Sequence, residues 1–265
     1  MRNLLLAITV AGVLPALPLV AQPAYRAPRA HDGKPNLNGI WQAIGSAHWN
    51  IEGHAARPGP LTAMGAVGAI PAGLGIVEGG KIPYQQWAEK KRKENAADWL
   101  AHDPEVKCYM PGVPRATYMP FPFQIVQTPT HVLMTYEFAN ASRIIYMNRP
   151  DFEAPIDTWM GHSRGKWEGD TLVVDVTSFN GQTWFDRAGN FHSDGLRVVE
   201  RYTAISPDAL LYEATMEDSN VFTRPWKIRM PLYRRLEKNA QLLEFKCVEF
   251  VEELIYGPYR KKAAN

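Results

Sequence analysis

Histidine, aspartate, arginine and tryptophan side chains are concentrated in one stretch of the chain, residues 157–202. The stretch has the sequence DTWMGHSRGKWEGDTLVVDVTSFNGQTWFDRAGNFHSDGLRVVERY. It holds His162 and His192, and an imidazole can accept and return a proton near neutral pH. Asp186 lies six residues before His192, with a Gly-Asn turn between them, and a carboxylate on one ring nitrogen fixes the tautomer of a histidine. This pattern predicts acid–base chemistry.

Each side chain of this predicted acid–base cluster has an expected role. His192 is the expected general base, Asp186 orients it, and His162 is the general acid. A guanidinium group from Arg164 or Arg201 would stabilise developing negative charge. The structural alternative is that His and Asp cap turns and that the glutamate forms a cross-strand ion pair. The predicted catalytic residues are His192, Asp186, His162, Arg164, Arg201 and Glu200.

Two other kinds of chemistry have a weaker basis in the same stretch. His162, Asp186, His192 and Asp194 supply ligands suited to zinc or iron, so a metal-dependent hydrolase is an alternative. The sequence has no HExxH motif, however, and we expect neither a metal ion nor another cofactor. GHSRG matches the GxSxG pattern of a serine nucleophile, but that motif joins a strand to a helix, and here a β-hairpin is expected.

Aromatic side chains are unusually frequent in and around the stretch. They could line a site for an apolar or aromatic ligand, or they could be ordinary core residues. The segment WFDR places two bulky aromatics beside opposite charges, which favours a role beyond packing. The predicted ligand-binding residues are Trp159, Trp167, Trp184, Phe185 and Phe191.

The N-terminus has the pattern of a secretory signal. Arg2 is followed by an apolar run from Leu4 to Leu14 and a small-residue exit up to Ala21, so residues 1–21 are a predicted signal peptide. No later stretch has the 18 or so apolar residues of a membrane span, and we expect a periplasmic or secreted protein that is not membrane-embedded. In an oxidising compartment Cys108 and Cys247 are expected to form a disulfide, the alternative being two buried thiols.

The 265 residues have an ordinary globular composition, with 46% hydrophobic and 21% charged side chains. A net charge of +2 gives no basic footprint for nucleic acid. Residues 22–265 are expected to form a single domain. One helix is predicted from Tyr84 to Leu100, and a glycine-rich loop over residues 57–80, which is either a lid over an apolar site or a flexible excursion.

Alternating apolar and polar residues predict about ten strands. Glu200 falls in line with Leu196, Val198 and Tyr202, and a dry sandwich core would not tolerate such a carboxylate. We therefore expect an all-β protein, an antiparallel up-and-down β-barrel of the lipocalin type with a partly polar interior. The predicted strands lie near 39–43, 123–128, 131–138, 142–148, 162–167, 171–177, 196–204, 210–217, 223–230 and 241–250.

Four long blocks carry a resemblance to an uncharacterised family of exported bacterial proteins. They are DGKPNLNGIWQ, DPEVKCYMPGVPRATYMPFPFQIVQTP, WMGHSRGKWEGDTLVVDVTSFNGQTWFDRAGNFHSDGLRVVERYT and FTRPWKIRMPLYRR. The resemblance implies export and a calycin-like barrel, and no particular reaction. A further similarity to lipocalin-type barrels rests on Gly39-Ile40-Trp41 and the number of strands.

These observations lead to one functional expectation and two alternatives. We expect an exported barrel that binds a small hydrophobic or aromatic molecule and acts on it as a cofactor-independent lyase, hydratase or isomerase. The first alternative is a periplasmic carrier that binds such a molecule without chemistry. The second is a metal-dependent hydrolase. The sequence leaves the oligomeric state open.

Overall fold

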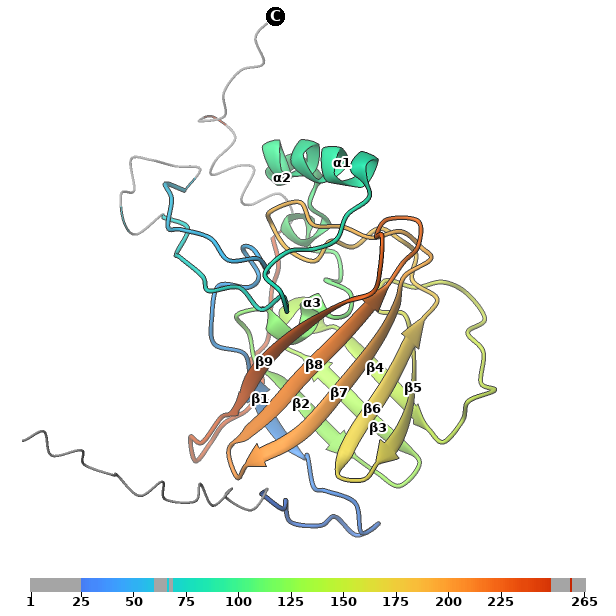
Figure 1. Cartoon of the computed structure of the whole chain (residues 1–265). Helices are drawn as coiled ribbons and strands as arrows, with labels where there is room; N and C mark the ends of the chain where they lie inside the picture. Colours follow the sequence, from blue (N-terminus) through green and yellow to red (C-terminus); the bar gives the residue numbers. More distant parts are fainter. Residues whose placement is uncertain (1–24, 60–65, 67–68, 249–257, 259–265) are drawn as a thin grey trace, which may run out of the picture.

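The computed structural model describes residues 25–59, 66, 69–248 and 258 of the chain. The predicted signal peptide lies outside these residues. Nine strands form a closed barrel in which each strand pairs with the next along the chain and β1 pairs with β9 (Figure 1). The strands are β1 (Gly39–Gln42), β2 (Phe123–Gln127), β3 (His131–Tyr136), β4 (Ser142–Met147), β5 (His162–Glu168), β6 (Thr171–Thr177), β7 (Arg197–Ser206), β8 (Ala209–Glu217) and β9 (Trp226–Arg234).

The barrel differs from the predicted one in two ways. It is mixed, because β4 and β5 are parallel, with Ile145 opposite Ser163 and Met147 opposite Gly165. Residues 148–161 therefore run from one end of the barrel to the other before β5 begins (Figure 1). The tenth strand, predicted at 241–250, is also wrong: residues 241–248 form no strand, and the last two lie outside the described residues.

Alternation along the strands places side chains in turn on the outer face of the wall and in a filled interior. On β7, Val198, Glu200 and Tyr202 are buried inside, whereas Arg197 and Arg201 lie outside. A period of two forces this arrangement, since successive side chains of a strand point to opposite faces. The predicted hairpin between β5 and β6 is present, with a positive φ of 59° at Gly169.

The interior contains a buried ion pair surrounded by tyrosines. The Arg143 guanidinium donates to both carboxylate oxygens of Glu200 at 2.6 and 3.0 Å. The hydroxyls of Tyr202 and Tyr212 each donate to the same carboxylate at 2.8 Å, and the Tyr136 hydroxyl accepts from Arg143 at 3.1 Å. The polar interior expected from the alternation of Glu200 is thus present, and every charge in it is paired.

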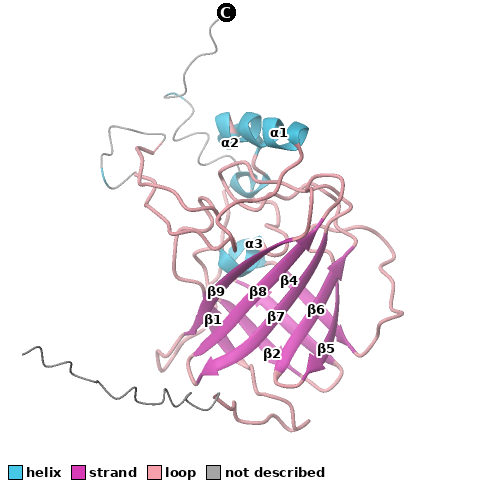
Figure 2. Cartoon of the chain, in the orientation of Figure 1, coloured by secondary structure: helices cyan, strands magenta, loops and turns pink. Residues whose placement is uncertain are grey.

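Helices and long loops gather at one end of the barrel (Figure 2). The helix predicted over residues 84–100 is divided into α1 (Gln86–Ala97) and α2 (Trp99–His102) at Asp98, whose φ of −138° is not helical. A 3-10 helix, η2 (Pro104–Lys107), and a single turn, α3 (Arg115–Tyr118), follow, and η3 (Phe138–Asn140) joins β3 to β4. None of the helices in the described residues is long and apolar enough to cross a membrane.

The predicted disulfide is confirmed. Cys108 and Cys247 are bonded, with their Cα atoms 5.7 Å apart. Cys247 lies in the C-terminal tail, where Phe245 packs against Phe121 and Phe138. The disulfide therefore ties a tail without strand structure to the loop that follows η2, which explains why the apolar alternation around Cys247 imitates a strand.

Candidate functional site

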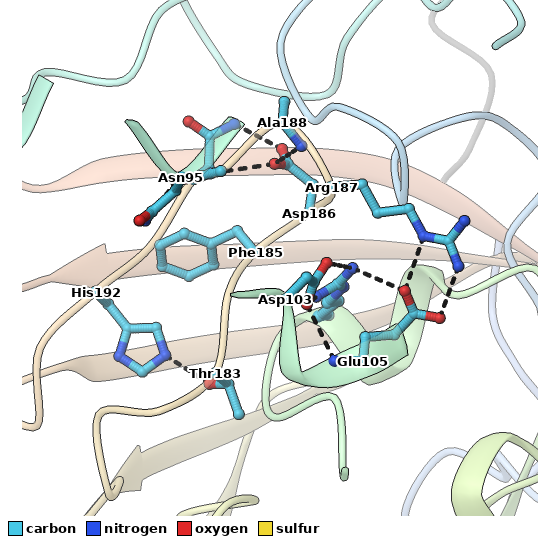
Figure 3. A network of polar contacts seen from close by, with 12 residues as sticks. Asn95, Asp103, Glu105, Thr183, Phe185, Asp186, Arg187, Ala188 and His192 are labelled. Atoms are coloured by element: carbon cyan, nitrogen blue, oxygen red, sulfur yellow. Dashed lines mark hydrogen bonds and ion pairs between the residues drawn. The ribbon is translucent and has the colours of Figure 1, made fainter. Parts of the chain in front are cut away.

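A chain of four charges, three of them buried, joins the loops at the helical end of the barrel (Figure 3). Arg115 donates to both carboxylate oxygens of Asp103 at 2.8 Å and to Glu105 at 3.3 Å. Arg187 donates to both oxygens of Glu105 at 2.8 and 3.0 Å. Burial alone would raise the pKa of Glu105, but the guanidinium groups of Arg187 and Arg115 outweigh it and hold that pKa below its usual value.

Local structure explains how each member of this charge chain is positioned. The Asp103 carboxylate accepts from the backbone N–H of Glu105 at 3.0 Å and thereby caps η2. The Arg187 guanidinium lies over the rings of Trp49 and Trp99, 4.6 and 5.0 Å from their centroids. These contacts hold three loops together, so the role of the charge chain is structural.

Asp186 is fixed within its own loop. Its carboxylate accepts from the backbone N–H of Ile51 at 2.8 Å and of Ala188 at 2.9 Å, and from the side-chain amide of Asn190 at 2.6 Å. Burial raises the pKa of Asp186 to about 6 in spite of these donors. No bond joins this carboxylate to His192, so the structure does not form the expected pair.

His192 pairs instead with a hydroxyl. Its Nδ1 lies 2.7 Å from the carbonyl oxygen of Ser193, and its Nε2 lies 2.6 Å from Oγ1 of Thr183. A carbonyl only accepts, so Nδ1 carries the proton and Nε2 accepts from the Thr183 hydroxyl. Burial lowers the pKa of His192, and the Phe185 ring lies beside the imidazole. A neutral imidazole on a hydroxyl is a base–nucleophile arrangement, but both residues are buried beneath the loops.

The other predicted catalytic residues lie apart from these two: Glu200 is inside the barrel, whereas His162, Arg164 and Arg201 are on its outer face. Glu200 is inside the barrel, bound to Arg143. Arg201 lies outside and donates to Glu168 at 2.8 Å. His162 also lies on the outer face of β5, where its Nε2 is 2.9 Å from the Phe152 carbonyl oxygen. The six predicted catalytic residues therefore do not converge on one cavity.

The five predicted ligand-binding aromatics also lie in separate places and do not line one cavity. Trp159 stacks on Tyr109 with ring centroids 4.8 Å apart. Phe185 is fully buried in the main core, and Trp184 belongs to a smaller cluster with Trp99. Packing accounts for these side chains, and so it does for Trp167 and Phe191, which are partly buried against the core.

A pocket of about 340 Å³ opens at the rim of the barrel, near β1 and β9. The two strands are paired only at Trp41–Arg234 and Gln42–Tyr233, so they separate towards the helical end. We call this opening the rim pocket. Its lining residues are Ala43, Ile44, Gly45, Ser46, Ala47, Asn50, Ala72, Gly73, Leu74, Gly75, Ile76, Tyr118, Arg229, Met230 and Pro231.

The end of the glycine-rich segment forms one wall of the rim pocket. The Ile76 carbonyl accepts from the N–H of Arg229 at 2.9 Å, and the N–H of Glu78 donates to Lys227 at 2.8 Å. Residues 76–78 thus pair with β9 where β1 has left it. Within the predicted loop, residues 76–78 lie on the barrel, whereas Arg57 and Ile70 pair with each other. Residues 60–65 and 67–68 lie outside the described residues.

Two glycines allow this wall to approach the preceding loop. Gly75 has a φ of +81°, and a Cβ atom there would lie 2.4 Å from the backbone nitrogen of Gly53. A Cβ atom on Gly73 would lie 2.4 Å from the Ser46 hydroxyl. Side chains at these positions would displace the wall, so the glycines specify the pocket rather than only a flexible loop.

The sequence contains a partial signal for the charge chain and for the rim pocket. Asp103, Glu105, Arg115 and Tyr118 all lie in the block DPEVKCYMPGVPRATYMPF, where charges stand among prolines and apolar residues. The sequence pattern predicts no functional role for Asp103, Glu105 or Arg115 in this block. Among the described residues, no group of three or more His, Cys, Asp or Glu side chains is placed to hold a metal ion.

No protein-family model matches the chain, and no curated protein matches it either.

Proposed function

We propose that this protein binds a small, mainly apolar molecule in the rim pocket and acts as an exported ligand-binding or carrier protein. The observation that supports this most directly is the separation of β1 from β9, which opens the wall onto Tyr118 and Met230. Both side chains belong to the buried core of the barrel end. A molecule in the rim pocket would therefore reach core side chains without any strand being displaced.

The lining suits a ligand of this kind. Small-molecule sites are concave, mostly apolar and about 300 to 1,000 Å³ in volume, and the rim pocket has about 340 Å³. Ile44 and Leu74 at its edges are 76% and 104% exposed, and large aliphatic side chains left in water beside a pocket are typical of a binding surface. Burial of these side chains by a ligand would favour binding.

A few polar groups would orient the ligand. The Asn50 side-chain oxygen accepts from the N–H of Glu52 at 2.9 Å, which leaves its NH₂ group as a donor. The Ser46 hydroxyl donates to the Ala72 carbonyl at 3.1 Å and keeps its acceptor lone pairs. A molecule with one carbonyl or hydroxyl group on an apolar body would match this set.

Export is part of the proposal. The Cys108–Cys247 disulfide supports it, because disulfides persist in oxidising compartments. The acid–base lyase and the metal-dependent hydrolase stay predictions and are not part of this proposal, since the residues expected to perform them lie in separate places.

The test is a titration of the mature protein with the uncharged fluorophore N-phenyl-1-naphthylamine. We expect saturable binding that Leu74→Asp weakens by about tenfold, the equivalent of losing one buried aliphatic contact. Ala72→Trp, which adds bulk at the pocket edge, should weaken it as well. The matched control is Leu236→Asp, at a side chain that is 68% exposed and outside the pocket. Equal affinity in Leu74→Asp and the wild type would refute the proposal.

A further inference from the structure

A second concave site lies on the outer wall of the barrel, away from the rim pocket. It is a groove of about 590 Å³ over β5, β6 and β7, bordered by Asn148, Arg149 and Pro150 at the start of the 148–161 crossover. The parallel pairing of β4 and β5 creates it, because the crossover must run along the wall there. We call it the wall groove.

Cationic side chains predominate in the wall groove. Outward positions on the strands contribute four of them, and the crossover contributes the fifth. The two carboxylates in the lining, Glu168 and Asp175, and Glu217 just beyond it leave two positive charges uncompensated. The cationic residues are Arg149, Arg164, Lys166, Arg197 and Arg201.

The carboxylates hold the cations in place rather than cancelling them. Asp175 binds Arg164 at 3.2 Å and Arg197 at 2.8 Å, one on each neighbouring strand. Glu168 binds Lys166 and Arg201, both at 2.8 Å. Each guanidinium keeps N–H groups outside these pairs, because it has five donors in a fixed fork. The groove thus presents positioned donors.

Two of the guanidinium groups have N–H donors that make no hydrogen bond or ion pair with a described residue. Arg149 lies 5.0 Å from the ring centroid of Phe152 and makes no ion pair with a described residue. Arg164 donates to the Pro150 carbonyl, Asp175 and Thr177, yet its buried Nε has no partner among the described residues. A buried donor without an acceptor is costly, and an anion satisfies this one when the side chain shifts to expose Nε to the groove.

The floor of the groove is apolar. Val173 and Val199 occupy outward positions on β6 and β7, opposite Arg201 and Asp175 respectively. Val173 is only 5% exposed despite facing outward, because the neighbouring long side chains flank it. An apolar floor with a cationic border suits an anion attached to an organic body.

We propose that the wall groove binds the oxyanion group of a small organic molecule, a phosphate, sulfate or carboxylate. The oxyanion lies among Arg149, Arg164 and Arg201, where charge-assisted hydrogen bonds from planar guanidinium groups favour it. The apolar part of the molecule lies on the two valines. This site is independent of the rim pocket and goes beyond the binding of an uncharged molecule there.

Calorimetric and ¹⁵N NMR titrations with inorganic phosphate, phenyl phosphate and benzoate test the proposal. Phenyl phosphate is expected to bind more tightly than inorganic phosphate, because the ring adds contact with the valines. Benzoate separates a requirement for a dianion from one for any oxyanion. Amide shifts should be confined to residues 148–150, 164–175 and 197–201. Raising the NaCl concentration about tenfold should weaken binding, since the charges lie at the surface.

Variants locate the site. Arg149→Gln removes a cation that makes no ion pair with any described residue, so the fold should not be disturbed, and it should weaken phenyl phosphate binding several-fold. Adding Arg201→Gln should bring the loss to about tenfold or more. Arg224→Gln is the control, because Arg224 is exposed and, within the described part of the chain, donates only to the Pro225 carbonyl. Circular dichroism confirms that each variant is folded.

Several outcomes would overturn the proposal. One is the absence of localised shifts with all three probes, which would leave only a network of surface ion pairs. Others are equal weakening by Arg224→Gln and unchanged binding in the double variant. Binding of a polyanion such as DNA without binding of phenyl phosphate would also overturn it. None of these results depends on whether the rim pocket binds an apolar molecule.

Discussion

Glu200 and Arg201 are neighbours in the chain and lie on opposite sides of the barrel wall. The Glu200 carboxylate is fully buried and accepts from Arg143 at 2.6 Å, whereas Arg201 reaches Glu168 on the outer face at 2.8 Å. Two members of the predicted acid–base cluster therefore belong to two unrelated sets of contacts. One set stabilises the interior, and the other borders the wall groove.

The interior ion pair should dominate stability. Glu200→Ala is expected to lower the free energy of unfolding by about 3 to 5 kcal/mol, because it leaves the buried Arg143 without a counter-charge. Arg201→Ala, which breaks an exposed pair, should cost at most about 1 kcal/mol. Urea denaturation followed by tryptophan fluorescence measures both.

A compensating change distinguishes a lost charge pair from a lost side-chain volume. The double variant Glu200→Leu with Arg143→Met should recover part of the stability lost in Glu200→Ala, since neither charge is then left unpaired. Equal losses in Glu200→Ala and Arg201→Ala would contradict the assignment of Glu200 to the dry interior.

Much of this barrel follows from alternation in the sequence. The period of two placed eight of the nine strands within a few residues, and it predicted that Glu200 faces inward with Tyr202. Alternation says nothing of the direction of the neighbouring strand, so the parallel pairing of β4 and β5 could not be predicted. Alternation also predicted a strand near Cys247 that does not form. Phe245 packs against Phe121 there, and Cys247 forms the disulfide, so both side chains are used without a sheet.

The candidate site was less predictable because its members come from distant loops. Asp186 and His192 are close in sequence, yet each finds a nearer partner: Asn190 for the carboxylate and Thr183 for the imidazole. The rim pocket depends on the separation of two strands that are far apart in the chain. Only the glycine density of residues 57–80 pointed to it.

Asp186 and His48 are expected to make opposite contributions to the pH dependence of stability. Burial raises the pKa of Asp186 from 3.8 to about 6, so its contribution is fully present below pH 3.8 and is lost as the pH rises to about 6. Burial, aided by Arg187, lowers the pKa of His48 from 6.5 to about 4, so stability is lost as the pH falls through this range.

Single substitutions should separate the two contributions. His48→Gln leaves Asp186, whose raised pKa lowers the free energy of unfolding as the pH rises from about 4 to about 6. Asp186→Asn leaves His48, so stability should increase over this range. The lowered pKa of His192 acts in the direction of His48 in both variants, so it adds to this increase and offsets part of the decrease in His48→Gln. The contributions of Asp186 and His48 to the free energy of unfolding each change by an amount on the order of 3 kcal/mol over this range. Thermal denaturation between pH 4 and 7 gives the slopes, and a slope in Asp186→Asn that is not more positive than the slope in His48→Gln would contradict the assignment.

The disulfide should stabilise the whole domain. Its two cysteines are 139 residues apart, and a crosslink of this span stabilises by up to about 5 kcal/mol in the chain-entropy model. Cys108→Ser with Cys247→Ser should therefore lower the denaturation midpoint sharply. Reduction of the wild type should give the same midpoint as the double variant. A midpoint that does not change on reduction would show that the crosslink constrains little in the unfolded chain.

The wall of the rim pocket provides a matched pair of glycines. Gly75 and Gly79 have nearly equal φ values, +81° and +79°. A Cβ atom on Gly79 meets nothing within 4 Å, whereas one on Gly75 would lie 2.4 Å from the Gly53 nitrogen. Gly79→Ala should cost about 1 kcal/mol, the cost of a left-handed conformation alone.

Gly75→Ala should cost at least about 1 kcal/mol more than Gly79→Ala, because it also pushes the wall away from Gly53. It should in addition weaken binding of N-phenyl-1-naphthylamine, which Gly79→Ala should leave unchanged. Chemical denaturation gives the first difference and fluorescence titration the second. Since the φ values match, any difference between the variants reports the close approach of the two segments. Equal stability with equal affinity would mean that this approach does not shape the pocket.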